Sequence, residues 1–328
     1  MASPREARTG TPQRRIDLDL IGKAARLHYD FGLTHQQISK ILGVSRVKVT
    51  RLLAQARETG IVQIAVNSDA SPYAALEHAA AERFGLEEAM IVPRFEDELD
   101  QRRAVARGAA TYLQRVLRDG TTVTMGFSRT LALVPDFVRP RGRVVNATFL
   151  PLVGGLGRTA DTVNAHESTD RLAQLFGCRG EHLHAPAIVG SAEVAAALRS
   201  EPMIQRALER AARADVAIVG LGSMRTTSLL EAGDLSPDAL KRLAAAGAVG
   251  DIAARFFDAD GQPAELDLGE RVIGLTLEEI RAIPVRVIAA AGQDKRGALR
   301  AALSAGTATV LISDDETVID LLSQAGSS

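Results

Sequence analysis

The sequence predicts an α/β protein in two parts, a small all-helical domain followed by a larger domain built on a mostly parallel sheet. Three observations lead to this prediction. The chain has 328 residues, a length that favours about two domains. Residues 35–54 have the spacing of a helix-turn-helix, and beyond Pro72 short β-rich runs alternate with amphipathic helical runs. Strands that alternate with helices need crossover connections, which produce parallel strands covered by helices on both faces.

Composition places the domain boundaries. Residues 1–15 are polar and basic and are expected to form a flexible arm, and residues 16–66 are expected to form the helix-turn-helix domain. Residues 67–72 gather Asn, Ser, Asp and Pro between two periodic segments, which is typical of a linker. Residues 73–328 are then expected to form the second domain.

The two parts differ in charge. Residues 1–66 carry 11 Lys and Arg against 5 Asp and Glu, whereas the rest of the chain carries 28 against 35. A basic head suits a polyanionic partner, because neutralising phosphates supplies most of the non-specific affinity for nucleic acid. A chance imbalance of surface charge is the alternative, and charge alone does not decide between them.

Composition also limits location and class. No run approaches the roughly 20 apolar residues of a membrane span, and residues 1–15 lack the apolar core of a secretory signal. The single cysteine, Cys178, cannot form an internal disulfide and fits a reducing compartment. The sequence therefore predicts a cytoplasmic protein that does not contact a membrane.

The head begins with a helix. Apolar positions recur at helical spacing from Leu18 to Phe31, and Gly32 is expected to end that helix. Two short helices are expected next, followed by a brief strand at residues 61–66.

The two short helices have the pattern of a helix-turn-helix. Such a motif needs a small residue where the helices touch and a glycine in the turn, and Ser39 and Gly43 fill these places. Ser45 is placed to cap the second helix. Five apolar residues are expected to form the shared core: Ile38, Leu42, Val44, Val49 and Leu52.

The outward face of the second helix predicts DNA binding. The first residues of a recognition helix reach base edges in the major groove, so Arg46, Val47 and Thr50 are candidates for base contacts. Lys48 and Arg51 could contact bases or phosphates. Gln36, Gln37 and Ser45 complete the predicted DNA-binding set. A structural helical hairpin with a solvated charged face is the alternative.

Strands and helices then alternate through the second domain. Strands are expected at residues 89–93, 121–126, 144–155, 181–186, 215–223, 285–292 and 307–313. Helices are expected at residues 104–117, shortly after 126, at 167–176, 204–213 and 293–304, and from Asp315 onward. Several strands end in glycine-rich turns. Ligands of such sheets bind outside the carboxyl ends of the strands, where the strand order reverses.

Four places bring polar groups to these strand ends. They are residues 125–130, residues 153–158, residues 220–223, and the pair Asp251 and Lys295. A strand-to-helix turn suits a phosphate or a cluster of hydroxyls, and a carboxylate with an ammonium suits a polyol with an anionic end. Tight-turn chemistry is the alternative for each glycine pair. No dinucleotide or ATP phosphate-loop motif is present, so no cofactor is expected.

Other reactive side chains are assigned plainer roles. His182 and His184 share one face of an expected strand, and with His166 they favour hydrogen-bonded histidines near the pocket over a metal site. Cys178 is expected to be inert. Lys295 could form an imine with a carbonyl ligand, although a salt bridge is the favoured role.

Segments spread over nearly the whole chain resemble a known family. They are LTHQQISKILGVSRVKVTRLLAQARETGIVQIAV, MGFSRTL, LPLVGGLGR, LHAPAIV, ADVAIVGLGSM, GDIAARFFDADG and IPVRVIAAAGQDKRGALRAAL. In this order and spacing they resemble the SorC-type transcriptional regulators, in which a helix-turn-helix precedes a sugar-binding domain related to glucosamine-6-phosphate isomerases. The resemblance implies a Rossmann-like, mostly parallel sheet in the second domain.

The resemblance also implies partners and a site. It implies operator DNA, a homo-oligomer (tetramer or dimer), and a small sugar, polyol or sugar-phosphate effector. The effector residues that it supports are Gly126, Ser128, Arg129, Thr130, Gly154, Gly155, Asn164, His166, Gly222, Asp251 and Lys295. The chain departs from the family at Phe127 and Ser128, at His166, where Asn is common, and at Val153, where some phosphate-binding relatives carry Arg. Whether the effector carries phosphate stays open.

Two functions follow as hypotheses. The favoured one is a non-enzymatic bacterial regulator of a carbohydrate or polyol catabolic operon, whose DNA binding responds to the effector. The alternative is a sugar-phosphate isomerase-like enzyme with an added DNA-binding domain. An enzyme needs a positioned acid and base, and Asp251, Asp258 and His166 are the candidates.

Overall fold

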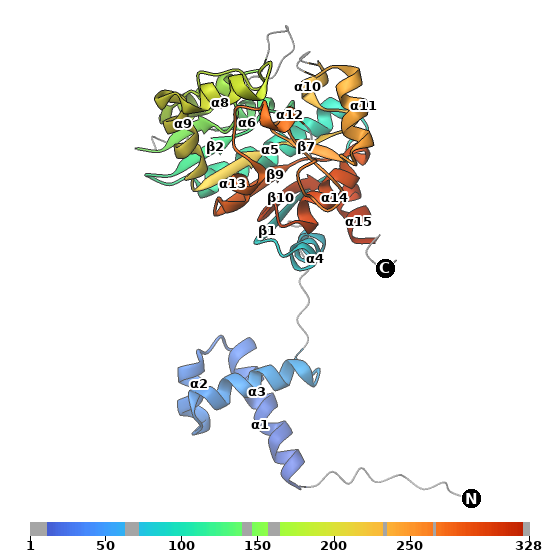
Figure 1. Cartoon of the computed structure of the whole chain (residues 1–328). Coiled ribbons are helices and arrows are strands. Elements are labelled where there is room, and N and C mark those ends of the chain that lie inside the picture. The colour runs from blue at the N-terminus through green and yellow to red at the C-terminus, as the bar shows by residue number, and fades with distance from the viewer. Residues whose placement is uncertain are drawn as a thin grey trace, which may run out of the picture. The chain divides into compact units, whose positions relative to one another are not determined.

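The chain forms two compact units, residues 1–70 and residues 71–328. The computed structural model describes residues 12–62, 72–139, 146–156, 165–231, 235–264 and 267–323. Figure 1 draws a helical first unit and a second unit in which helices surround a sheet. The expected α/β architecture is thereby confirmed.

The first unit consists of α1 (Pro12–Tyr29), α2 (His35–Leu42) and α3 (Arg46–Glu58) (Figure 1). Apolar residues of all three helices share one small core, which includes Ala24, Ile38 and Val49. α1 begins at Pro12, so residues 12–15 belong to a helix and not to a flexible arm. Proline favours the first helical position, because its missing N–H would have no partner there anyway. Of the strand expected at residues 61–66, Ile61 and Val62 are not in a strand and the rest lies outside the described residues.

A seven-stranded sheet forms the centre of the described second unit, and every pairing in it is parallel. Its strands in spatial order are β1 (Glu88–Val92), β10 (Val310–Asp314), β9 (Val285–Ala289), β5 (Val216–Val219), β2 (Thr122–Met125), β3 (Thr148–Pro151) and β4 (Arg179–Gly180). From β2 the chain continues to β3 and β4 on one side, and from β5 it continues to β9 and β10 on the other. The order therefore reverses between β2 and β5, which is where ligands of such sheets bind.

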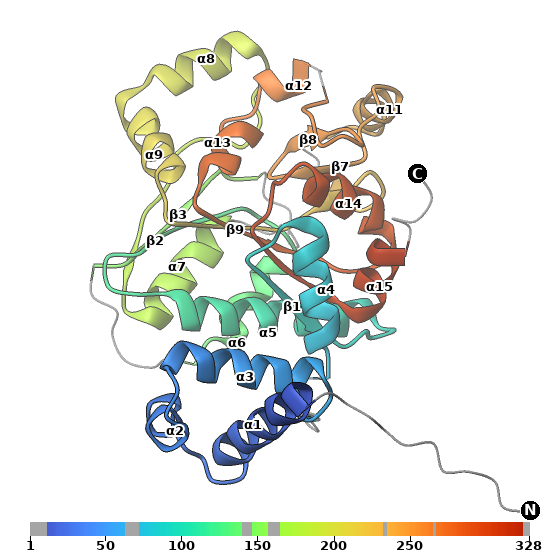
Figure 2. The same cartoon turned by 90° about the horizontal axis from the view of Figure 1, so that it is seen from below.

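Helices cover both faces of this sheet. One face packs against α5 (Glu98–Val116), η1 (Leu131–Leu133), α6 (Val134–Phe137) and α7 (Ala165–Phe176). Figure 2 shows α5, α6 and α7 close together. The core on the other face includes residues of α4 (Ala74–Phe84), α8 (Ala192–Ser200), α9 (Pro202–Ala212), α10 (Ser228–Glu231), α11 (Pro237–Ala245), α12 (Asp267–Glu270), α13 (Leu277–Ala282), α14 (Arg296–Ser304) and α15 (Asp315–Ser323). Successive residues of β5 alternate between these two cores, as strand geometry requires. No described helix is long and apolar enough to cross a membrane.

A second, antiparallel sheet adjoins the large one. It contains β6 (Gly222–Ser223), β7 (Gly250–Ile252) and β8 (Arg255–Phe257). β7 and β8 are joined by Ala253 and Ala254, both with positive φ (51° and 68°). A two-residue hairpin needs such angles, which alanine adopts only at a cost in strain. The sequence pattern does not predict this sheet.

The prediction of a strand at residues 181–186 is wrong. The strand lies just before it, at Arg179–Gly180, and the chain leaves β3 after Glu181 donates to the Phe149 carbonyl. Beyond that point the backbone pairs with the loop after β3: Gly155 donates to the Ala185 carbonyl, and Ala187 donates to the Gly155 carbonyl. Residues 181–186 are therefore a loop at the carboxyl ends of β3 and β4.

Candidate functional site

The helix-turn-helix has the predicted geometry. Gly43 ends α2 with φ of 66°, and the Ser39 hydroxyl donates to the Val44 carbonyl across 2.6 Å. The Ser45 hydroxyl accepts from the Lys48 amide at 3.2 Å, which caps α3. Ile38, Val49 and Leu52 are buried, and Leu42 and Val44 pack partly buried against them. These contacts hold α3 at a defined angle to α2.

The outward face of α3 is open to solvent. Arg46, Val47, Lys48, Thr50 and Arg51 are all exposed, and Val47 keeps 71% of its surface accessible. No described carboxylate lies within ion-pair distance of the three basic residues of this row. An exposed valine surrounded by unpaired cations has no role in the core, but it suits the contact between an apolar side chain and a thymine methyl group in the major groove.

Besides Ser45, the predicted DNA-binding residues Gln37 and Thr50 have side chains with local partners. The Gln37 side chain accepts from the Thr34 amide, and the Thr34 hydroxyl accepts from the Gln37 amide, so the pair forms a capping box at the start of α2. The Thr50 hydroxyl donates to the Arg46 carbonyl at 3.2 Å and lies 3.3 Å from His35 Nδ1. Gln36 is exposed beside them.

The second candidate site lies where the order of the large sheet reverses. The loops after β2 and β5 touch there, because a Cβ on Gly220 would lie only 2.3 Å from Ser128 Cβ. Between them is a narrow space of about 20 Å³, here called the inner compartment. It is lined by Arg102, Phe127, Ser128, Arg129, Thr130, Gly220, Leu221, Gly222, Thr226, Ser228, Asp251, Ala253 and Lys295.

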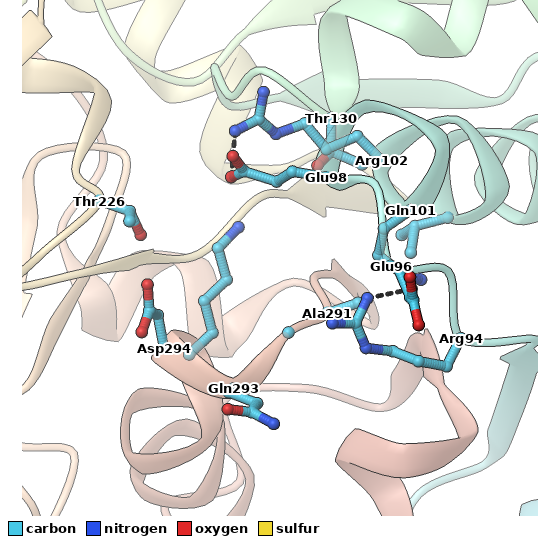
Figure 3. Close-up of a pocket in the computed structure, with 13 residues that line it drawn as sticks. Arg94, Glu96, Glu98, Gln101, Arg102, Thr130, Thr226, Ala291, Gln293 and Asp294 are labelled. Atoms are coloured by element: carbon cyan, nitrogen blue, oxygen red, sulfur yellow. Dashed lines mark hydrogen bonds and ion pairs between the residues drawn. The ribbon is translucent and has the colours of Figure 1, made fainter.

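A wider space of about 260 Å³, the outer compartment, adjoins the inner one. Both are lined by Arg102, Thr130, Thr226 and Lys295. Figure 3 shows the outer compartment, with Arg102 and Thr130 on one side and Gln293 and Asp294 on the other. The inner compartment holds about one water-sized group, so a sugar-sized ligand would place one polar group there and its body in the outer compartment.

The structure brings together six of the predicted effector residues. Ser128, Arg129, Thr130, Gly222, Asp251 and Lys295 all line the inner compartment. Gly126 lies just below, at the buried end of β2, where a Cβ would meet Val219 at 3.6 Å. Asn164 lies outside the described residues.

The other predicted effector residues lie elsewhere. Gly154 and Gly155 line neither compartment, and their amides donate to the Ile273 and Ala185 carbonyls. A Cβ on Gly154 would lie 2.5 Å from the Ala185 carbonyl oxygen, so close backbone packing by itself explains that glycine. His166 lies beside Gly155, with Nδ1 3.4 Å from His182 Nδ1.

These histidines form a cluster at the carboxyl ends of β3 and β4. The His166 and His182 rings are nearly parallel, and His184 lies next to His182. Burial lowers the pKa of His166, and the two neighbouring imidazoles lower it further. His182 Nε2 lies 3.5 Å from Asp170. Within the part of the chain that the structure describes, no three such side chains are placed to hold a metal ion.

Asp251 and Lys295 carry the unusual electrostatics of the inner compartment. Asp251 is buried; its Oδ2 accepts from the Ala254 amide, while its Oδ1 has no partner among the described residues. Burial raises the pKa of Asp251 to about 6, against the opposing effects of Thr227, the Ala254 amide and Lys295. Burial also lowers the pKa of Lys295 to about 8, assisted by Arg129 and Arg102. A polyol hydroxyl could donate to the unpartnered oxygen.

The position of Lys295 at the start of a helix is unfavourable for its positive charge. It precedes α14, whose N-terminus carries partial positive charge, and Arg129 and Arg102 contribute like charges. An anionic group bound here would relieve all of these repulsions. The compartment therefore combines a carboxylate that can accept from hydroxyls with cationic groups that can bind an anion.

The first turn of α5 contributes pocket residues that were not predicted from the sequence. Glu98, Gln101, Arg102 and Val105 all line the outer compartment, at the spacing of one helical face. The helix was expected to begin at residue 104, whereas it begins at Glu98. The signal was available, because Asp97 is a good N-cap and its carboxylate accepts from the Asp100 amide at 2.9 Å.

Family comparisons match each of the two parts of the chain. A sugar-binding domain model matches residues 68–323, and a Crp-like helix-turn-helix domain model matches residues 15–68. The chain is 30% identical to the transcriptional regulator LsrR of Klebsiella pneumoniae, over 94% of each chain. It is 30% identical to the deoxyribonucleoside regulator of Bacillus subtilis, over 90% of this chain and 94% of the relative. It is 29% identical to the erythritol catabolism regulatory protein EryD of Brucella abortus, over 94% of this chain and 98% of the relative.

A solved structure has the same arrangement along the chain. The full-length sorbitol operon regulator SorC of Klebsiella pneumoniae is similar with a TM-score of 0.73 and 25% identity. The similarity covers 94% of this chain and 99% of that chain. The order of domains, the parallel sheet and the sequence identity together lead to one assignment. The chain belongs to the family of SorC-type transcriptional regulators, in which a helix-turn-helix precedes a sugar-binding domain.

Proposed function

We propose that this regulator binds operator DNA through the exposed face of α3, under the control of a small sugar, polyol or sugar-phosphate effector bound in the two compartments. The observation that carries the proposal is the convergence of Ser128, Arg129, Asp251 and Lys295 on one narrow space at the reversal of strand order. Hydroxyl, guanidinium, carboxylate and ammonium groups in such a place suit a small polar ligand.

The regulator acts in the cytoplasm as a homo-oligomer, a dimer or a tetramer. An operator with two half-sites needs two recognition helices at a fixed separation, and one chain supplies a single α3. The effector favours one arrangement of subunits, and this arrangement changes that separation. Relatives named for deoxyribonucleosides, erythritol and sorbitol support a carbohydrate or polyol operon as the target.

The proposal is tested with the full chain in two steps. Selection from random duplex DNA yields a preferred sequence, and fluorescence anisotropy then measures the affinity for it at several salt concentrations. A thermal-shift screen of sugars, polyols and their phosphates identifies the effector, because a ligand that binds only the folded state raises Tm. The hit is expected to change the DNA affinity. A chain that selects no DNA sequence, or a hit that leaves DNA binding unchanged, would refute the proposal.

The enzymatic alternative is addressed by the same screen. Asp251 and Lys295 both titrate near neutral pH, which is the range of an acid–base pair. We propose that they bind the effector without converting it, since the relatives above are named as regulators. Incubation of each hit with the protein, followed by mass and NMR analysis, is expected to return the ligand unchanged, and its isomerisation would favour the enzyme.

A further inference from the structure

The first residue of α5 brings a carboxylate to the cationic wall of the pocket. The Glu98 carboxylate is hydrogen-bonded and ion-paired to the Arg102 guanidinium, one helical turn away (Figure 3). The same Glu98 oxygen lies 4.0 Å from Arg129 Nη2. Arg102 and Arg129 both line the inner compartment, whereas Glu98 lines only the outer one. Glu98 therefore joins two arginines from the mouth side of the effector site.

This carboxylate balances an excess of positive charge. Arg102, Arg129 and Lys295 face one another around the inner compartment, and Asp251 is the buried acid among them. The two arginines disfavour the charged form of Lys295, while Glu98 and Asp251 favour it. Glu98 thus supplies a negative charge that this cluster needs when no ligand is bound.

The exposed fractions of these three side chains indicate that a ligand can replace Glu98 as the partner of the two arginines. The Glu98 side chain keeps 70% of its surface accessible, against 18% for Arg102 and 27% for Arg129. An ion pair with so exposed a carboxylate contributes little stability, because water competes for it. A phosphate group, in contrast, can accept hydrogen bonds from two guanidinium groups at once and carries more charge.

We propose that Glu98 is an internal counter-ion of the effector site: it pairs with Arg102 and Arg129 in the free protein, and an anionic group of the effector displaces it. The proposal rests on the effector site proposed above and adds to it the charge of the ligand. A neutral polyol cannot take over the role of a carboxylate between two guanidinium groups. Glu98 therefore competes with anionic ligands for the arginines and lowers the affinity for them.

The surroundings of Glu98 connect this exchange to the loop after β1. Asp97, which caps α5, precedes Glu98 directly. Buried Gln101 accepts from the Phe95 amide at 2.7 Å and from Arg94 Nη1 at 3.2 Å. Arg94 in turn pairs with Glu316 of α15. The first turn of α5, which carries Glu98, is therefore bonded to the loop after β1, and that loop is bonded to α15.

The test uses glycerol 3-phosphate and glycerol as probes, because the two differ only in the phosphate group. Each is titrated calorimetrically into the full-length protein and into Glu98→Gln. The variant is expected to bind glycerol 3-phosphate about fivefold more tightly, the upper range for loss of an exposed ion pair. Glycerol is expected to bind neither protein measurably. Arg129→Gln is expected to weaken binding of glycerol 3-phosphate in both backgrounds.

The matched control is Asp100→Asn. Asp100 lies in the same helical turn and pairs with Arg103 at 3.2 Å, but it lines neither compartment. This substitution removes the same charge from the same helix end and is expected to leave the affinity unchanged. An equal gain in both variants would mean that the general field of the helix is responsible and would overturn the proposal.

Two further results would overturn it. Weaker or equal binding by Glu98→Gln would mean that Glu98 orients the arginines or contacts the ligand. No binding of glycerol 3-phosphate to either protein would mean that the arginines form no anion site. DNA selection by the same Glu98→Gln preparation separates these outcomes from failure of the proposed function, because α3 contains none of the substituted residues.

Discussion

The carboxylate of Asp251 lies against the α-carbon of Gly222, its partner across the small antiparallel sheet. The two residues are paired in register between β6 and β7, and a Cβ on Gly222 would lie 2.1 Å from Asp251 Oδ1. That oxygen is also the one without a partner among the described residues. The absence of a side chain at Gly222 thus leaves room for the acid at the base of the inner compartment.

Gly222→Ala is therefore expected to push the Asp251 carboxylate out of place. Binding of the effector found in the screen should weaken by about tenfold or more, equivalent to about 1.4 kcal/mol. DNA binding without effector should be retained, since α3 belongs to the other unit. Gly190→Ala is the control, because a Cβ there would meet nothing within 4 Å. Equal affinities of both variants would show that the contact with Asp251 is not needed for binding.

Arg46→Ala is expected to reduce the sequence preference of the regulator. Arg46 is the first residue of α3 and is exposed, so its guanidinium can reach a base edge. The loss should be about 1–3 kcal/mol at one base pair of the preferred sequence, with little change elsewhere. Arg57→Ala, at the far end of α3, is expected to affect all sequences alike or not at all. Anisotropy titrations against single-base variants make the comparison, and an unchanged preference in Arg46→Ala would refute the assignment.

Two glycine substitutions in the first unit are expected to have opposite effects. Gly43 has φ of 66°, so alanine there is strained and should destabilise the turn by about 1 kcal/mol. Gly22 lies inside α1 with open space around it, so alanine there should stabilise by about 0.5–1 kcal/mol. Hydrogen exchange of the α2 and α3 amides measures both effects. Effects of equal sign would contradict this helix-turn-helix geometry.

Asp251→Asn is expected to change how stability depends on pH. The pKa of Asp251 rises from 3.8 to about 6 on folding, so the folded state favours the protonated acid. The cost of its charge is absent below pH 3.8, grows between 3.8 and 6, and is complete above 6, on the order of 3 kcal/mol. Asparagine carries no such charge. The variant should therefore gain stability relative to the natural protein as pH rises from 4 to 7, by up to this amount.

Urea unfolding at pH 4, 5.5 and 7 measures this difference. The control is Asp260→Asn, since Asp260 is an exposed carboxylate of the same domain. The free energy of unfolding of this control should change with pH as that of the natural protein does. Parallel curves for Asp251→Asn and the natural protein would mean that Asp251 has no unusual pKa.

The sequence predicted best what depends on neighbours in the chain. Ser39, Gly43 and Ser45 are all within a few residues of the groups they contact, and the structure confirms each of these roles. The polar loops after β2 and β5 were also predicted, because both directly follow apolar strands. Their contact through Ser128 and Gly220 depends on strand order, which the sequence pattern does not contain.

What the sequence did not predict depends on distant partners. A pocket role for Glu98 and Arg102 could not be predicted, because it depends on the packing of α5 beside the loop that carries Arg129. Gly154 resembled a ligand loop from its sequence, but the nearby carbonyls of Ala185 and Pro186 account for it. The hairpin of β7 and β8 turns through two alanines, which carry none of the usual turn signals.

The pairing of β1 with β10 has a consequence for folding of the chain during its synthesis on the ribosome. Glu88 lies opposite Val310, so the first strand of the sheet acquires this neighbour only when synthesis is nearly complete. The three helices of the first unit are contiguous and can fold as soon as they emerge. A nascent or prematurely terminated chain would therefore contain a folded helix-turn-helix before its large sheet was complete. It would also leave the edges of β1 and β9 uncovered, where other unfinished chains could add.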